Sequence, residues 1–154
     1  LGDYFNSGML LMNMKELRNV HLAEHFLYLL NKYHFDCVAP DQDYLNSMCY
    51  GKIEYLDSCW DAMPNRNKPE IENPKIIHYN LFDKPWCYDD IQYQDYFWEY
   101  AKQSVYYDKI KAYKAAYTDK QKEDDHAHLL DLFRRAGTNA DTEVTFRKVL
   151  ESGY

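Results

Sequence analysis

Hydrophobic and polar positions follow two different patterns along the chain, and the change falls near residue 87. In the first part, short apolar runs of strand length at 9–12, 52–56 and 75–79 alternate with helical segments and turns. Residues 15–33 carry one apolar stripe at helical spacing, made of Leu22, Phe26, Leu29, Leu30 and Tyr33. This order predicts strands joined by crossover helices, which is the α/β class.

Turn-forming residues separate these elements. Pro40 stops any helix that precedes it, and Asp41 is predicted to be the N-cap of a short helix that Gly51 would end. Residues 61–74 contain three prolines and several asparagines, which predicts a loop.

Beyond residue 88 the apolar spacing becomes helical throughout. The recurring positions are Tyr96, Tyr100, Tyr107, Ile110, Tyr113 and Tyr117, followed by Leu129, Leu130, Phe133 and Ala136. Gly137 is predicted to end the second of these helices, and a last helix is predicted over 141–151 with Val149 and Leu150 on its apolar face. We therefore expect an α/β part over residues 1–87 and an α-helical tail over residues 88–154.

Composition narrows the function classes. A length of 154 residues suffices for one domain with a buried core. The formal net charge of -7 argues against a broad basic face, so no nucleic-acid partner is expected. No apolar run approaches the roughly 20 residues of a membrane span. The cysteines (Cys37, Cys49, Cys59 and Cys87) lack zinc-ligand spacing, which favours free and mostly buried thiols in a cytosolic protein.

Three polar clusters stand at predicted strand ends or helix starts, where α/β proteins bind ligands: residues 5–8 (FNSG), 41–43 (DQD) and 78–86 (HYNLFDKPW). Each also has a structural interpretation. Asn6 with Gly8 would shape a turn, Asp41 would cap a helix, and His78 would be a satisfied structural histidine.

The order and spacing of the three clusters resemble the retaining glycosyltransferases of family eight. The matching residues run from Tyr4 to Asn13, from Asp41 to Asn46, and from Ile76 to Tyr79 with Lys84-Pro85-Trp86. The resemblance covers roughly residues 3–87 and implies the C-terminal part of a GT-A fold. It also implies transfer of a hexose, glucose or galactose, from a UDP-sugar to a hydroxyl of a glycan or glycolipid.

The resemblance assigns roles to five residues. His78 would be a ligand of Mn²⁺ or Mg²⁺, and Lys84 would contact the diphosphate of the donor. Asn6, Asp41 and Gln42 would hold the donor sugar, with Asp41 and Gln42 as the catalytic residues. Gln42 lies closest to the position of a nucleophile, although an amide is a poor nucleophile.

The neighbouring residues of these clusters have structural expectations. Asp43 is expected to cap a helix or to support the site residues. Pro85 and Trp86 are expected to fix their loop by packing.

Two departures from the family pattern matter. The family often has glycine three residues after the motif histidine, where this chain has Leu81. The family's metal-binding Asp-x-Asp lies before the FNSG segment, and only five residues precede Asn6 here. The chain also begins Leu1-Gly2-Asp3 without methionine. We therefore expect it to be part of a larger enzyme and to be inactive alone.

Residues 102–122 combine six lysines with four interleaved tyrosines: Lys102, Lys109, Lys111, Lys114, Lys120, Lys122, Tyr106, Tyr107, Tyr113 and Tyr117. One interpretation is a helix lying on an anionic membrane surface, which would place a cytoplasmic enzyme at the inner face of the membrane. The other is a solvated helix whose tyrosines pack on the domain. His126 and His128 beside two aspartates favour capping and solvent exposure over a metal site.

A rival to the enzyme is a non-catalytic interaction module with a tyrosine-rich helical interface. In either case a partial sheet would expose apolar edges, so a homo-oligomer is expected. An Asp-x-Asp upstream in the parent reading frame would favour the enzyme.

Overall fold

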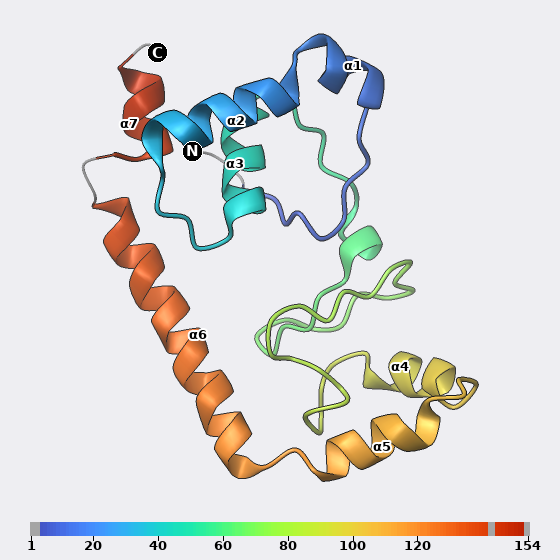
Figure 1. Ribbon diagram of the computed structural model, residues 1–154. Helices are drawn as coiled ribbons and strands as arrows, with labels where there is room; N and C mark the ends of the chain where they lie inside the picture. Colours follow the sequence, from blue (N-terminus) through green and yellow to red (C-terminus); the bar gives the residue numbers. More distant parts are fainter. Residues whose placement is uncertain (1–3, 142–143, 153–154) are drawn as a thin grey trace. The chain divides into compact units, whose positions relative to one another are not determined.

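The computed structural model describes residues 4–141 and 144–152, apart from the side chain of Leu150. Over these residues the chain forms helices (Figure 1), in the order α1 (Met14–Asn19), α2 (Leu22–Tyr33), α3 (Pro40–Met48), the 3-10 helix η1 (Ser58–Asp61), α4 (Gln94–Ala101), α5 (Tyr107–Ala115), α6 (Asp119–Ala140) and α7 (Phe146–Glu151). The chain divides into two compact units. Unit 1 comprises residues 1–55 with 131–154, and unit 2 comprises residues 56–130.

The strands predicted at 9–12, 52–56 and 75–79 are not present in the described part of the chain. Its one β-type pairing is an isolated parallel bridge between Ala62 and Ile77. An extended segment becomes a strand only when a neighbouring segment completes a ladder of backbone hydrogen bonds. These apolar runs find such a neighbour only at the bridge, so the structure does not confirm the α/β class.

The helix predicted over 15–33 is divided into α1 and α2. His21 adopts a left-handed backbone conformation with φ of 51°, which interrupts the ladder between the two helices. The stripe beginning at Leu22 lies on α2, where Leu29 is buried. His34, also left-handed, ends this helix through a bond from its N–H to the carbonyl of Leu30.

The start of α3 differs from the prediction by two residues. Pro40 is its first residue and Ala39 is the N-cap, so Asp41 lies in the first turn and is not the cap. Proline suits this position because its fixed φ is helical and its missing N–H would have no partner there. Gly51, with φ of 73°, lies beyond the actual end of the helix at Met48.

An aromatic core holds unit 1 together. Tyr44 of α3 is 2% exposed, and its ring meets those of Phe26, Phe35 and Phe146 at centroid distances of 4.8, 5.9 and 4.8 Å. Through Phe146, helix α7 joins this core. The helix begins five residues later than the predicted 141, and residues 142–143 of that prediction lie outside the described residues, as does the side chain of Leu150.

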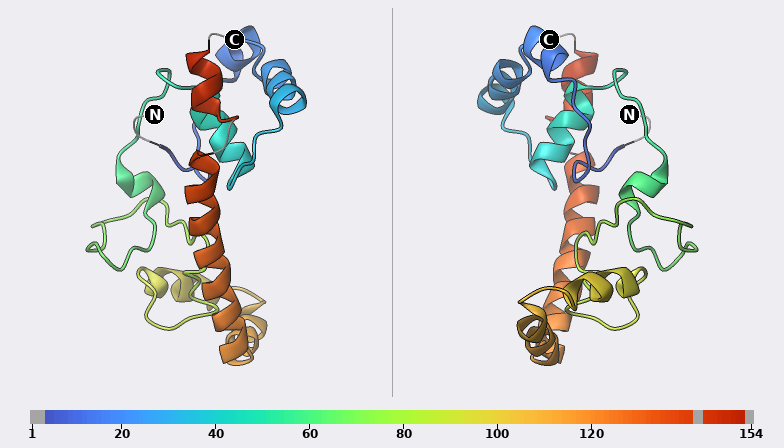
Figure 2. Two further views of the ribbon diagram at one scale, coloured as in Figure 1. Left: turned by 90° about the vertical axis from the view of Figure 1, so that its left-hand side faces the viewer. Right: turned by 90° about the vertical axis from the view of Figure 1, so that its right-hand side faces the viewer.

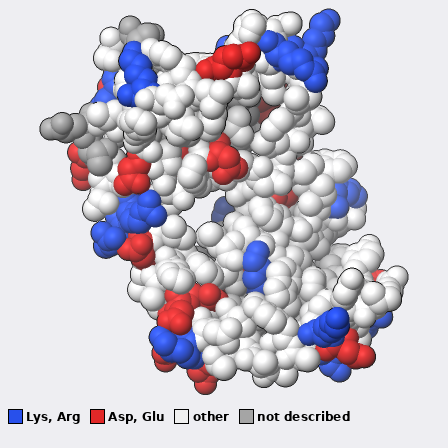
Figure 3. Space-filling view, in the orientation of Figure 1, with Lys and Arg blue, Asp and Glu red and all other residues white. Residues whose placement is uncertain are grey.

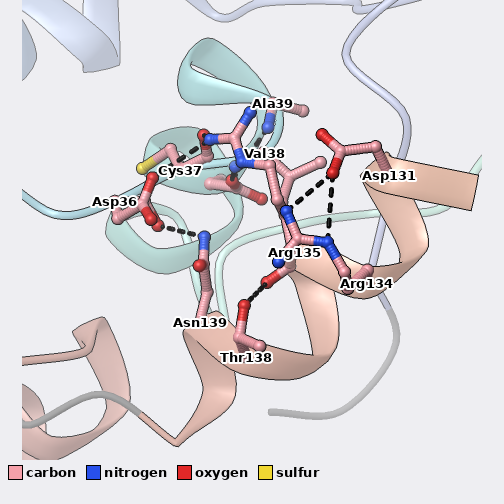
Figure 4. Close-up of polar contacts among 10 residues, drawn as sticks. Asp36, Cys37, Val38, Ala39, Asp131, Arg134, Arg135, Thr138 and Asn139 are labelled. Atoms are coloured by element: carbon pink, nitrogen blue, oxygen red, sulfur yellow. Dashed lines mark hydrogen bonds and ion pairs between the residues drawn. The ribbon is translucent and has the colours of Figure 1, made fainter. Parts of the chain in front are cut away.

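The C-terminal end of α6 belongs to unit 1 and contacts the segment before α3 (Figure 4). The guanidinium of Arg135 donates to the carboxylate of Asp36 at 3.1 Å, and Asn139 donates to the Asp36 carbonyl at 2.9 Å. Gly137 lies between these two contacts and is helical, so it does not end the helix as predicted. Figure 2 shows α6 as one uninterrupted helix. Glycine ends a helix only where the residues after it adopt a non-helical backbone. Here the contacts of Arg135 and Asn139 with Asp36 favour continuation of the helix past Gly137.

Unit 2 contains η1, α4, α5 and the first part of α6. The rings of Tyr79, Trp86 and Phe97 form one aromatic cluster. The packing role predicted for Trp86 is therefore confirmed, and Pro85 is also fully buried. A second cluster joins Tyr88 and Tyr117, whose hydroxyls both donate to one carboxylate oxygen of Asp125, at 2.7 and 2.6 Å.

The lysines of residues 102–122 are not equivalent. Lys114 lies inward and donates to the carbonyls of Pro85 and Tyr88, at 2.9 and 2.7 Å. Its ammonium also pairs with Asp89 and lies over the ring of Trp98. Lys120 and Lys122 pair with acidic neighbours on their own helix. On the face shown in Figure 3, basic and acidic side chains lie next to one another without a continuous basic patch.

Two further findings bear on the predictions from sequence. No helix within the described residues is long and apolar enough to cross a membrane. The cysteines are free thiols, of which Cys87 is buried and the others are half-buried. Burial raises the pKa of Cys37 to about 11, which keeps this thiol protonated.

Candidate functional site

The FNSG segment is fixed against α3 by a side chain that imitates a strand neighbour. The amide of Asn46 accepts from the N–H of Phe5 and donates to its carbonyl, both at 2.8 Å. The same amide donates to the carbonyl of Gln42 at 2.8 Å. Asn46 is 5% exposed. The backbone before Asn6 is therefore held by two hydrogen bonds, as it would be in a sheet.

Ser7 joins this segment to two predicted sugar-binding residues. Its N–H donates to the side-chain oxygen of Gln42 at 2.8 Å, and its hydroxyl donates to the carboxylate of Asp41 at 2.8 Å. Asn6 bonds within its own turn, where its side-chain oxygen accepts from the N–H of Gly8 at 2.7 Å. The structure thus brings Asp41 and Gln42 of α3 together at Ser7, and Asn6, the residue before Ser7, shapes the loop turn that ends at Gly8.

Asp43 holds the backbone that leads into α3, which agrees with the supporting role that was one of its two predicted roles. One of its carboxylate oxygens accepts from the N–H groups of Val38 and Ala39, both at 3.1 Å, and the other accepts from the hydroxyl of Tyr4. Burial and this carboxylate together raise the pKa of Tyr4 to about 12. Asp41, in the first turn of α3, is exposed.

We expect Asn46→Ala to lower the free energy of unfolding by about 2 kcal/mol, because it leaves the N–H and the carbonyl of Phe5 without their partner. Urea denaturation followed by circular dichroism measures this change. The matched control is Asn31→Ala, at an exposed position of α2, which should be neutral or slightly stabilising because alanine favours helix. Equal losses in both variants would contradict the role of the Asn46 amide.

His78 lies in unit 2 beside a carboxylate that the sequence did not single out. Its Nδ1 atom is 3.1 Å from the carboxylate of Asp61, the last residue of η1. Both side chains are half-buried, 29% and 23% exposed. Backbone bonds on each side of the pair keep it in register: Ala62 donates to the carbonyl of Ile76, and His78 donates to that of Ala62, both at 2.9 Å.

Lys84 lies in the loop that follows His78. Its ammonium donates to the carbonyl of Tyr79 and lies 5.6 Å from the centre of the Trp86 ring. Burial lowers the pKa of Lys84, against a smaller opposing effect of Cys87 and Asp83. Tyr79, which follows the predicted metal ligand His78, is therefore in contact with Lys84, the residue predicted to bind the diphosphate. The structure places His78 and Lys84 in unit 2, and Asn6, Asp41 and Gln42 in unit 1.

Leu81 has the backbone conformation that glycine adopts most easily. Its φ of 42° lies in the left-handed region, and its side chain is largely exposed. The position where the family often has glycine therefore keeps a glycine-like backbone in this chain, at the steric cost that a Cβ brings there.

Leu81→Gly is expected to raise the free energy of unfolding by up to about 1 kcal/mol, because the steric cost that it removes exceeds the conformational entropy that glycine adds to the unfolded chain. Thermal and urea unfolding measure the gain. Leu81→Ala serves as the control, since alanine keeps the Cβ and should give no such gain. A destabilised glycine variant would show that the left-handed conformation is not strained.

Residues 2–90 match the profile of the family described as Glycosyl transferase family 8. The chain belongs to glycosyltransferase family 8. Membership of family 8 implies a GT-A-like glycosyltransferase, and the resemblance drawn from the three motifs is confirmed.

Three curated relatives match a similar part of the chain. A Haemophilus influenzae protein named as a glycosyltransferase is 31% identical to this chain over 92 residues. The match covers 54% of this chain and 28% of the Haemophilus influenzae protein. Lipopolysaccharide 1,2-glucosyltransferase of Escherichia coli is 29% identical over 98 residues, 56% of this chain and 29% of its own length. General stress protein A of Bacillus subtilis is 28% identical over 102 residues, 55% of this chain and 36% of its own length.

This family 8 chain therefore spans about a third of the length of the curated relatives it matches. No solved structure matches it.

Enzymes of family 8 are generally metal-dependent, so the donor set of this chain is informative. Within the described residues, no three His, Cys, Asp or Glu side chains gather in a way that could hold a metal ion. His78 supplies a single imidazole nitrogen, which suits one position of a Mn²⁺ or Mg²⁺ site shared with other ligands. The described residues fit the role of one ligand and do not form a complete site.

Sequence reasoning missed Ser7, Asn46 and Asp61 as supports of the predicted site. Ser7 and Asn46 stand inside the recognised motifs, so their place in the FNSG and DQDYLN letters was an available signal. Asp61 stands at the start of a predicted loop, and nothing in the local pattern distinguishes it from the other aspartates.

Proposed function

We propose that this chain is part of a retaining hexosyltransferase that moves glucose or galactose from a UDP-sugar to a hydroxyl of a glycan or glycolipid. Residues 1–87 would be the C-terminal part of its catalytic domain, and residues 88–154 a helical extension. The observation that carries the proposal is the junction at Ser7, where two motifs 34 residues apart meet through hydrogen bonds to Asp41 and Gln42. Family membership and the name of the Escherichia coli relative support the same reaction class.

Asn6, Asp41 and Gln42 would bind the donor sugar in this proposal. Carboxylate and amide groups discriminate hydroxyl orientations because each offers paired acceptors or donors at fixed angles. Asp41 is exposed and Gln42 half-buried, so both remain accessible from solvent. Their present partner is Ser7, whose hydroxyl is of the same chemical kind as a sugar hydroxyl. A donor sugar would exchange with that partner or extend its hydrogen bonds.

His78 and Lys84 would act on the diphosphate. Departure of UDP develops negative charge on the phosphate oxygens, and a divalent cation neutralises this charge when it is bound. His78 would be one ligand of that cation, and the carboxylate ligands would come from outside the described residues. Lys84 would contact the diphosphate as a point charge. Burial lowers its pKa, and the bound anion would favour its charged form.

A transfer assay on the full-length protein that contains this chain tests the proposal. UDP release from UDP-glucose or UDP-galactose, with Mn²⁺ and an added glycan acceptor, is expected to be lost on chelation by EDTA. The isolated chain is expected to be inactive under the same conditions. Release of UDP that persists in EDTA would contradict the metal-dependent reaction, and an active isolated chain would contradict the need for other ligands.

Peripheral membrane contact through residues 102–122 remains part of the proposal. Tyr106 and Tyr113 are exposed, and the ammonium groups of Lys109 and Lys111 on α5 lie over the rings of Tyr106 and Tyr107. Such side chains suit the boundary between lipid headgroups and acyl chains. Co-sedimentation with vesicles rich in phosphatidylglycerol, reduced by Lys109→Glu with Lys111→Glu, would support it. Binding unchanged by these substitutions would favour the solvated helix.

A further inference from the structure

Asp61 contacts the side of His78 that a metal ion would not use. The distance of 3.1 Å joins the Asp61 carboxylate to Nδ1, and no described residue bonds to Nε2. A carboxylate offers only acceptors, so Nδ1 must carry the proton in this pair. The lone pair of a neutral imidazole then lies on Nε2, which is the atom left for a cation.

The backbone around the pair has little freedom to move it. Asp61 ends η1, and the helix is capped at its start by the carboxylate of Asp57, which accepts from the N–H of Cys59 at 2.8 Å. Ala62, the next residue, is fully buried and forms the parallel bridge with Ile77.

A second tether between the two segments lies one step further along the same pairing. The amide of Asn80 contacts the sulfur of Met63 at 3.2 Å. The two segments are thus joined at the bridge next to the carboxylate–imidazole contact and again beyond it.

We propose that Asp61 is a positioning residue that holds the imidazole of His78 in the Nδ1–H tautomer, with Nε2 free to bind a divalent cation. This inference rests on the proposed role of His78 as a metal ligand. Ligating histidines commonly donate their other N–H to a carboxylate, which fixes the orientation of the ring and increases its basicity as a ligand. A purely structural pairing would favour the same tautomer, so the metal affinity of Asp61 variants is the measurement that separates a positioning role from a structural one.

The tautomer is measurable without activity. In the 154-residue chain labelled with ¹⁵N, at a pH of about 8 where imidazoles are mostly neutral, two-bond ¹H–¹⁵N correlations report which nitrogen is protonated. We expect the Nδ1–H form of His78 in about tenfold excess or more, since a charge-assisted hydrogen bond favours it. A dominant Nε2–H form in the unsubstituted chain would overturn the proposal.

Two substitutions at Asp61 sharpen the test. Asp61→Ala removes the acceptor, and Asp61→Asn introduces an amide that can donate to Nδ1, so both should increase the Nε2–H form. The control is Asp90→Asn, which removes one charge from an exposed aspartate of the same unit whose left-handed backbone asparagine tolerates well. It should leave the tautomer of His78 unchanged. A tautomer ratio that no Asp61 variant alters would also overturn the proposal.

Metal affinity provides the second readout. In the full-length protein, free Mn²⁺ measured by electron paramagnetic resonance should show binding weakened about 10- to 100-fold by Asp61→Ala and unchanged by Asp90→Asn. Unchanged affinity in Asp61→Ala would reject the positioning role. If His78→Ala itself left Mn²⁺ binding intact, the metal assignment in the proposed function would fail, whereas the tautomer measurement would still decide whether Asp61 orients the ring.

Discussion

Replacing His78 by alanine in the full-length protein is expected to reduce Mn²⁺-dependent UDP release from the sugar donor by about 100-fold or more. Loss of a ligand weakens binding of the cation that would neutralise the leaving diphosphate. Removing one group that stabilises developing negative charge typically lowers the rate about 100- to 1000-fold. The measurement is the initial rate of UDP release at saturating donor, repeated over a range of Mn²⁺ concentrations. Part of the lost rate should return at high Mn²⁺, because the remaining ligands still bind the ion weakly.

The control for this prediction is His126→Ala, at an exposed position of α6. It removes an imidazole of the same size from a site without a proposed role, so the rate should stay within about twofold of the unsubstituted protein. A full rate in His78→Ala would show that His78 is a structural histidine paired with Asp61, which is the alternative that the sequence left open. A similar loss in both variants would point to general destabilisation.

Much of the local structure could be predicted from the sequence, because the deciding contacts are close along the chain. The stripe from Leu22 to Tyr33 is helical, since apolar side chains three and four residues apart share one face. The proline at position 40 correctly marked a helix boundary because its ring fixes φ and removes a donor. The motif letters located the clusters around Asn6, Asp41 and His78 in the regions where the structure has polar contacts.

The rest depends on contacts that no local pattern contains. The partner of Phe5 is Asn46, 41 residues away, and the partner of His78 is Asp61, 17 residues away. The predicted strand at 75–79 depended equally on a neighbour, and a single bridge at Ile77 is all the described residues provide. Gly137 shows the same effect in a helix, where contacts of Arg135 and Asn139 with Asp36 outweigh the tendency of glycine to end it.

Replacing Tyr44 by alanine is expected to lower the free energy of unfolding by about 3–5 kcal/mol, which is the range for removing a large aromatic side chain from a core. Tyr44 is 2% exposed and touches three aromatic rings from three separate segments, so no single segment can move to fill the space. Urea denaturation followed by tyrosine and tryptophan fluorescence and by circular dichroism measures the change. Because α3 carries Tyr44, Asp41 and Gln42, the same variant should also weaken donor binding in the full-length protein.

Tyr44→Phe separates the ring from its hydroxyl. Within the described part of the chain the hydroxyl is buried without a hydrogen-bond partner, and such a group costs about 1–3 kcal/mol. Phenylalanine keeps all three ring contacts and removes that cost, so it should match or exceed the stability of the unsubstituted chain. A loss of more than about 1 kcal/mol in Tyr44→Phe would mean that the hydroxyl has a partner in solution, such as a buried water, and that the core is more polar than its four rings imply.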